Sequence, residues 1–309
     1  MFVRSGCNDP GDALMVLVVF LLAWLVRRRL DLSDTLSGDR VWRVWFHSGR
    51  AAKAGHEMEI RWGLLRVLVP ALLLVGLVWT ASAHGWRMAV YPLEFLLLLG
   101  LMGAPGWKPL LRAYSEAWSR GDMQAAWHHI KDCLPAYERG QAVSPDEMHR
   151  ALSKQLLVAV FERFFLVAFW YVVGGIGLAF LARGLVALQE HWPQAAARPR
   201  YARIAGLAKW LPARLLACTF GLAGDLAGWL KTARGVLFSS GLAADRVLIQ
   251  AANGALTGYA LDPARFARIH PDEWTAFGGR SLKAIRDLLN RSMLVWVCGM
   301  ALLVIAGVV

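Results

Sequence analysis

Residues 161–180 read FERFFLVAFWYVVGGIGLAF, in which an acid and a base precede a run of aromatic, aliphatic and glycine residues. From Phe164 to Ala182 the chain carries no charge. At about 1.5 Å of rise per residue, a helix of this length approaches the roughly 30 Å thickness of a hydrocarbon core. The stretch therefore predicts a membrane-spanning helix, and its glycines favour close packing of a neighbouring helix.

The pair Glu162-Arg163 has two interpretations. An ionisable residue deep in a bilayer is costly and is often functional. The apolar run 164–182 is long enough to span by itself, however, which would place the pair at the membrane boundary, where charges are tolerated and aromatic residues gather. We interpret the pair as an interfacial anchor, with a reactive site as the alternative.

The composition extends this interpretation to the whole chain. Of the 309 residues, 57% are hydrophobic and only 18% are charged, which is too apolar for an ordinary soluble domain. We expect an all-α polytopic membrane protein, one integral membrane domain over 1–309, with about four to six membrane-embedded helices and no strands. Besides 164–182, four stretches are candidate spans: 13–26, 67–86, 88–107 and 292–309.

A more polar stretch, 108–154, separates two of these spans and predicts a helical cytoplasmic insertion. The dipeptide Gly121-Asp122 predicts a turn between two of its helices, with Asp122 as a cap. Ser144, followed three residues later by Glu147, is typical of a further helix start. Beyond the insertion, 190–203 predicts a loop, and 210–224 predicts a short buried or re-entrant helix.

The net charge of +12 could indicate a nucleic-acid partner. The basic residues, however, lie mainly in loops beside apolar stretches, and in a membrane protein this pattern reports orientation. They are frequent between the first two spans, whereas the next connection has only Arg87. We therefore expect a cytoplasmic first loop, a periplasmic N-terminus in a bacterial inner membrane, and no nucleic-acid partner.

Known catalytic patterns are missing from the sequence. It contains no Walker loop, HExxH motif, nucleophile elbow or CxxC pair. Its four cysteines have spacings that support neither a zinc site nor a disulfide framework. Neighbouring His128 and His129 would point about 100° apart on a helix and could not easily share a metal. We expect no metal, no cofactor and no catalysis.

Isolated polar residues remain as a candidate ligand-binding or structural cluster. Arg214 and Asp225 are three helical turns apart on one predicted face, about 16 Å along the axis, and cannot pair with each other. Each needs another partner, and Glu94 is a candidate for Arg214. The candidate cluster consists of Glu94, Glu162, Arg163, Arg214 and Asp225.

Four motifs follow one another in a recognisable order: Gly121-Asp122, RFFLVAFWYVVGGIGLAFLARGL (163–185), WLPARLLACTFGLAGD (210–225) and NRSMLVWVCGMALL (290–303). This order resembles the AmpE family, inner-membrane proteins associated with regulation of β-lactamase induction in Gram-negative bacteria and related to the CobD/CbiB cobalamin-biosynthesis proteins. The resemblance begins at about Met15, so we interpret residues 1–14 as an extension or a misassigned start.

The two branches of that family imply different functions. The cobalamin branch joins an aminopropanol moiety to a corrinoid carboxylate with ATP, and it carries acid-Asn and Asp-Gly motifs just before its Phe-Trp pair. Here QLLVAVFER (155–163) has one acid and neither motif. The cobalamin branch also has Asp and Asn ahead of its Pro-Ala-Arg-Leu, where this chain has Ala205, Gly206 and Lys209.

The resemblance therefore implies the regulatory branch. We expect an inner-membrane modulator of β-lactamase induction or cell-wall stress signalling, embedded in the lipid bilayer. Its further partner would be a cell-wall-derived small molecule or another membrane protein. The alternatives are a cobalamin-type amide synthase with a degenerate site, and a membrane small-molecule or lipid binder.

Overall fold

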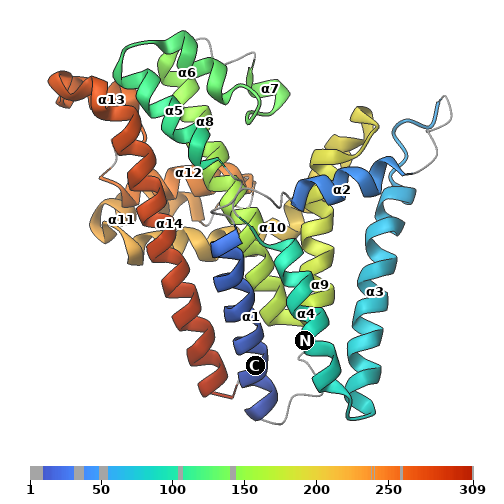
Figure 1. Ribbon diagram of the computed structural model, residues 1–309. Helices are drawn as coiled ribbons and strands as arrows, with labels where there is room; N and C mark the ends of the chain where they lie inside the picture. The colour runs from blue at the N-terminus through green and yellow to red at the C-terminus, as the bar shows by residue number, and fades with distance from the viewer. Residues whose placement is uncertain are drawn as a thin grey trace. The chain divides into compact units, whose positions relative to one another are not determined.

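The structure is a computed structural model, and every regular element in its described residues is a helix, which confirms the all-helical prediction (Figure 1). The chain divides into two compact units. The first consists of Met1–Pro105, Phe161–Pro212 and Val297–Val309, and the second of Gly106–Val160 and Ala213–Trp296. The described residues are 10–30, 38–48, 55–103, 107–139, 144–237, 239, 241–257 and 260–307. Residues 1–9, most of the predicted extension, lie outside them.

Within the described residues, three helical segments are long and apolar enough to cross a membrane: Arg61–Ala83, Pro145–His191 and Pro271–Ile305. This is fewer than the four to six expected. The stretch 88–107 forms a helix of only 15 residues, α4 (Arg87–Leu101), whereas a crossing needs about 20. The stretch 13–26 lies in α1 (Pro10–Leu30), a helix of 21 residues with three arginines in its last turn.

The first unit surrounds α9, whose two halves pack against different neighbours. Phe20 of α1 stacks on Tyr171 of the first half, with ring centroids 6.0 Å apart. In the second half, a Cβ on Gly177 would lie 2.4 Å from Cγ2 of Val75 in α3, so the glycine permits this close approach, as the sequence predicted. The helices of this unit are α1, α2 (Gly38–His47), α3 (Arg61–Ala83), α4, η1 (Phe161–Phe165), α9 (Leu166–His191), η2 (Ala195–Ala197) and parts of α10 (Arg198–Ala223) and α14 (Trp274–Ile305).

Helix α9 is interrupted at Gly174 and Gly175. Gly174 has φ −150° and ψ 22°, and Gly175 has φ 71° and ψ −166°, so neither is helical. The Gly175 conformation is one that essentially only glycine adopts without strain. The stretch 164–182 is therefore helical, as predicted, but it is not one straight helix. The first arm, 166–173, is only about 12 Å long.

The second unit contains the predicted insertion, and its helix boundaries follow the predicted caps. Asp122 Oδ1 accepts a hydrogen bond from the Ala125 amide at 2.9 Å, and Gly121 has φ 76°. Ser144 and Glu147 exchange two hydrogen bonds of 3.2 Å. The helices of this unit are α5 (Lys108–Ser119), α6 (Met123–Ile130), α7 (Ala136–Arg139), α8 (Pro145–Val160), α11 (Leu226–Leu237), α12 (Ala244–Ala255), α13 (Pro263–Ile269), η3 (Pro271–Glu273) and the remaining parts of α10 and α14.

Two predicted boundaries near α10 were wrong. The stretch 190–203, predicted as a loop, is largely helical, because α9 continues to His191 and α10 begins at Arg198. The predicted short helix 210–224 is the second half of α10, which ends at Ala223. Asp225 therefore lies beyond the helix that carries Arg214, and the same-face argument for these two residues does not hold.

Candidate functional site

Asp39, in the first turn of α2, binds two arginines. Arg163 lies in η1, the turn that precedes α9, and Arg183 lies in the second half of α9. Arg163 Nη2 donates to Asp39 Oδ2, and Arg183 Nη2 donates to Asp39 Oδ1 at 3.1 Å. On a straight helix Arg163 and Arg183 would be about 30 Å apart. The break at Gly174-Gly175 turns the chain back, so that α9 forms a helical hairpin with both arginines at its open end.

The charge of Asp39 is stabilised by its neighbours. Burial by itself would raise the pKa of Asp39, but the His191 imidazole and the Arg163 and Arg183 guanidiniums outweigh that effect and hold this pKa well below its usual range. Arg183 is 3% exposed, so its charge is screened little by solvent. The carboxylate therefore stays ionised at physiological pH, as the anion of a charge-assisted clamp.

A second ion pair closes the same end of the hairpin. Lys209 Nζ of α10 donates to Glu162 Oε1 at 2.5 Å and to Gln189 Oε1 at 3.0 Å. Glu162 is 4% exposed and lies in the π-helical turn η1, a distortion that is frequent at functional sites. Removing two charges from water is costly, and the pair persists because each charge has a close partner.

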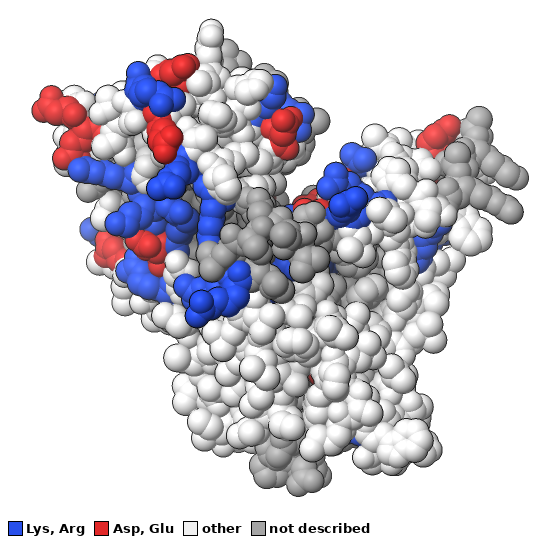
Figure 2. All heavy atoms as spheres, in the orientation of Figure 1, with Lys and Arg blue, Asp and Glu red and all other residues white. Residues whose placement is uncertain are grey.

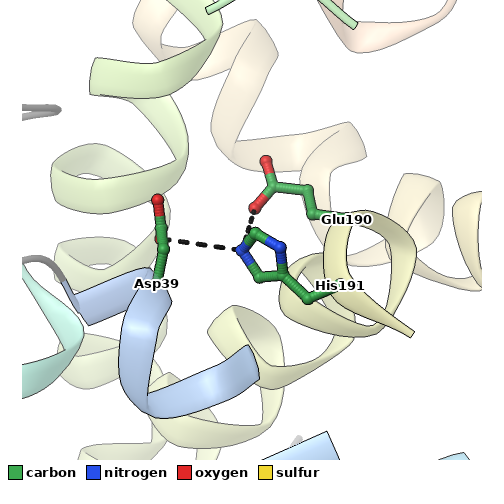
Figure 3. Close-up of side chains that lie close together, drawn as sticks. All are labelled: Asp39, Glu190 and His191. Carbon is green, nitrogen blue, oxygen red and sulfur yellow. Dashed lines mark ion pairs between the residues drawn. The ribbon is translucent and has the colours of Figure 1, made fainter. Parts of the chain in front are cut away.

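Three further polar atoms, from Arg183, Glu190 and His191, face one another beside the Asp39 clamp, and Figure 3 shows Glu190 and His191 next to Asp39. His191 Nε2 lies 3.8 Å from Asp39 Oδ1 and 3.6 Å from Glu190 Oε2, and Arg183 Nη1 lies 3.7 Å from Glu190 Oε2. These distances are too long for direct hydrogen bonds. Among the described residues, Arg183 Nη1, Glu190 Oε2 and His191 Nε2 are buried and have no hydrogen-bond partner.

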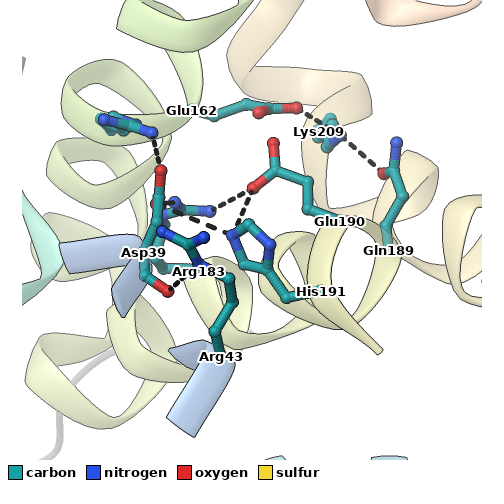
Figure 4. Close-up of polar contacts among 9 residues, drawn as sticks. Asp39, Arg43, Glu162, Arg183, Gln189, Glu190, His191 and Lys209 are labelled. Carbon is teal, nitrogen blue, oxygen red and sulfur yellow. Dashed lines mark hydrogen bonds and ion pairs between the residues drawn. The ribbon is translucent and has the colours of Figure 1, made fainter. Parts of the chain in front are cut away.

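We call these side chains together the mouth cluster, which Figure 4 draws with Arg43, a residue that contacts only the backbone carbonyl of Asp39 there. Its three cations and three anions balance one another, with His191 and Gln189 as further polar groups. The members of the mouth cluster are Asp39, Glu162, Arg163, Arg183, Gln189, Glu190, His191 and Lys209.

The chemistry of the mouth cluster favours a polar ligand over a bare cation. Asp39, Glu190 and His191 could each offer one atom to a metal ion, and these atoms lie within 4.8 Å of one another. Both oxygens of Asp39, however, already accept from guanidiniums, whose charge opposes that of a metal. A group that both donates and accepts hydrogen bonds would suit Arg183 Nη1, Glu190 Oε2 and His191 Nε2 together.

The structure places three predicted site residues in the first unit. Glu162 and Arg163 both belong to the mouth cluster, and their position at a membrane boundary stays a prediction. Glu94 of α4 is 1% exposed and accepts a hydrogen bond from the Tyr171 hydroxyl at 2.8 Å. Glu94 thus ties α4 to the first arm of the hairpin.

The other two predicted residues have structural contacts in the second unit. Arg214 donates to the carbonyl oxygens of Leu237 at 3.1 Å and Ser239 at 2.6 Å. Asp225 Oδ1 accepts from the Ala227 amide at 3.0 Å, at the start of α11. The sequence predicted a carboxylate partner for Arg214 and gave no sign of these two backbone carbonyls.

Most of the mouth cluster was missed from the sequence. Arg183 was not among the candidates, Lys209 was noted only as a departure from a family motif, and 190–203 was interpreted as a loop. The one available signal was that charges cluster at both ends of the 164–182 run. Asp39 gave no signal of its own, because it lies in a stretch of sequence rich in charged residues.

A serine-histidine-tyrosine chain in the second unit resembles a nucleophile array but is enclosed. His149 Nδ1 lies 2.9 Å from the Tyr114 hydroxyl, and His149 Nε2 lies 2.8 Å from Ser281 Oγ. Tyr114 and His149 are 0% exposed and Ser281 is 2% exposed. Trp118 and Phe277 pack around the imidazole. With no exposed face toward a substrate, the chain stabilises the core of this unit.

Comparisons of this chain with protein-family models, curated proteins and solved structures found no match.

Proposed function

We propose that this chain is an AmpE-like inner-membrane protein that modulates β-lactamase induction or cell-wall stress signalling without catalysing a reaction. Its ordered motifs over 163–185, 210–225 and 290–303 support the proposal, together with three helical segments whose length and composition suit a membrane, one of which doubles back at Gly174-Gly175. The observation that carries it is the mouth cluster. Asp39 and Glu162 are each neutralised by cationic side chains, an arrangement that suits a polar switch better than a reacting carboxylate.

The one motif shared with the cobalamin branch also favours this choice. Arg214, in Pro-Ala-Arg-Leu, donates to two backbone carbonyls. One belongs to Leu237, the last residue of α11, and the other to Ser239, which follows it. Such contacts hold a connection in place. The motif therefore supports a shared scaffold and provides no argument for amide synthesis.

The proposed orientation follows the distribution of basic residues. The first loop contains α2, whose Arg40 and Arg43 are exposed. Figure 2 shows Lys and Arg at the α2 end of the first unit, whereas the visible surface along α3 is almost free of charge. Under the positive-inside rule this pattern supports a cytoplasmic α2 and a periplasmic N-terminus.

A second candidate function is binding of a polar small molecule at the mouth cluster. Three buried atoms without hydrogen-bond partners favour it: Arg183 Nη1, Glu190 Oε2 and His191 Nε2. A cell-wall-derived compound, carrying hydroxyl, amide and carboxylate groups, could satisfy all three. Because the atoms belong to the arm after Gly175, binding there would act directly on the hairpin.

Deletion of the gene tests the proposed function. The deletion should change β-lactamase induction and the level of peptidoglycan fragments during β-lactam challenge, and a plasmid copy should restore both. No change under any β-lactam would contradict the proposal. Growth of a cobalamin auxotroph that lacks the amide synthase, when supplied with this gene, would support the cobalamin alternative instead.

Reporter fusions test the orientation separately. Fusions within residues 27–63 should report a cytoplasmic location. A periplasmic signal from this loop would reverse the proposed topology.

A further inference from the structure

A groove in the second unit carries a second set of polar groups, unrelated to the mouth cluster. It is lined by residues of α7, α8 and α12 and by the residues that precede α13. Its polar lining includes Glu138, Arg150, Lys154, Gln250, Asn253 and Asp262.

Both cations of the groove are already engaged by carboxylates of this unit. Lys154 Nζ donates to Glu138 Oε1 at 2.6 Å and lies 3.0 Å from Asp245 Oδ2. Arg150 Nη2 donates to Asp262 Oδ1 at 2.7 Å. These pairs hold the groove walls together.

Two acceptor atoms in the lining are buried without a hydrogen-bond partner among the described residues. They are Glu138 Oε2 and Asn253 Oδ1, and both residues line the groove. The Glu138 side chain is 8% exposed, so solvent reaches it little. A buried acceptor without a partner typically costs about 1–3 kcal/mol, more when charged. A ligand that donates hydrogen bonds to both atoms would therefore be stabilised.

The charge of the groove selects the kind of donor. Three carboxylates, those of Glu138, Glu147 and Asp262, line it, against the two cations Lys154 and Arg150. This excess of negative charge favours a cationic ligand. An ammonium group has several N–H donors and no acceptor, which matches two unpartnered acceptors in a negative groove.

We propose that this groove binds a small organic ammonium ion, whose N–H groups donate to Glu138 Oε2 and Asn253 Oδ1. A neutral polyol could donate hydrogen bonds there but would gain nothing from the excess charge. A bare divalent cation would need several convergent oxygens. In the described part of the chain, the side-chain group that could hold a metal is Asp39, Glu190 and His191 of the first unit.

Calorimetry on the full-length protein in detergent micelles tests this site. The probes are putrescine, spermidine and glucosamine. 1,4-Butanediol is the neutral counterpart of putrescine, glucose is that of glucosamine, and magnesium chloride supplies a cation without N–H donors. At least one amine should bind at low salt, more weakly as salt is added, and more tightly than its neutral counterpart. Absence of binding by all three amines would overturn the proposal. So would equal binding of the diol and the diamine, or binding of magnesium in place of the amines.

Variants locate the binding. Glu138→Gln should weaken it about tenfold or more, the effect of losing a hydrogen bond to a charged group. Because this change also loosens Lys154, Asn253→Ala serves as a second test and should weaken binding several-fold. Glu116→Gln, at an exposed carboxylate of α5, is the matched control. Unchanged affinity in both groove variants would overturn the proposal. The site is independent of the proposed regulatory function, so either can fail alone.

Discussion

Arg163 and Arg183 are twenty residues apart in the chain, yet both guanidiniums bind the carboxylate of Asp39. Only the reversal at Gly174-Gly175 permits this meeting, because a straight helix would separate the two residues by about 30 Å. The apolar run that looked like a simple span is thus a hairpin. Its open end gathers charges from α2, α9 and α10 into one cluster.

The hairpin should depend on Gly175. At φ 71° and ψ −166° a Cβ is strained, and Gly175→Ala should lower the free energy of unfolding by about 1–3 kcal/mol. Denaturant unfolding in micelles, followed by circular dichroism, measures this. Gly206→Ala on α10, where a Cβ would meet nothing within 4 Å, is the control and should be neutral or stabilising by up to about 1 kcal/mol. Equal effects of the two changes would contradict the hairpin.

Glu162 and Lys209 should be strongly coupled. Glu162→Leu or Lys209→Met alone leaves a buried charge without its ion-pair partner and should cost about 3–5 kcal/mol. The double variant removes both charges and should cost clearly less than the sum of the single changes. The unfolding free energies of wild type, the two single variants and the double variant form a double-mutant cycle that measures the coupling. Additive costs would show that the pair does not interact.

Asp39 should make stability depend on pH. Its pKa is lowered in the folded protein, so its contribution is complete above the unfolded value of about 4 and is lost as pH falls through the folded value. Asp39→Asn should therefore lower the melting temperature at pH 7, and the difference should narrow below about pH 4. Asp287→Asn, exposed on α14, should change little at either pH. A difference that stays constant with pH would contradict the clamp.

The buried imidazole of the second unit should be structural. His149→Ala removes the partner of the Tyr114 hydroxyl and Ser281 Oγ and leaves a cavity, at a cost of about 2–4 kcal/mol. His128→Ala, exposed on α6, should stay within about 0.5 kcal/mol. Thermal unfolding, together with limited proteolysis of this unit, measures the stability of both variants. Wild-type stability of His149→Ala would contradict the packing role.

Much of the fold could be predicted because its signals are local. Uninterrupted apolar runs predicted helices, and the Asp122 cap and the Ser144-Glu147 pair marked two helix starts. The reversal at Gly174-Gly175 could not be predicted, since glycines in an apolar run also serve close packing, as Gly177 does here. The same ambiguity led to one straight span being expected over 164–182.

The site was harder to predict because its partners are distant in the sequence. Glu162 and Arg163 were identified as candidates, but periodicity carries no information about which residue of another helix they meet. Their partners, Lys209 and Asp39, come from α10 and α2. Arg214 shows the same limit, since a charge in an apolar stretch suggested a carboxylate partner, and nothing in the sequence indicated the two backbone carbonyls to which it donates.

Complementation of the deletion strain tests most directly whether the mouth cluster carries the proposed function. β-Lactamase induction would be compared for wild type, Asp39→Asn and the control Asp287→Asn, at equal protein levels in the membrane. We predict that wild type and Asp287→Asn restore induction to the parental level and that Asp39→Asn does not. Full restoration by Asp39→Asn would contradict a functional role for the cluster.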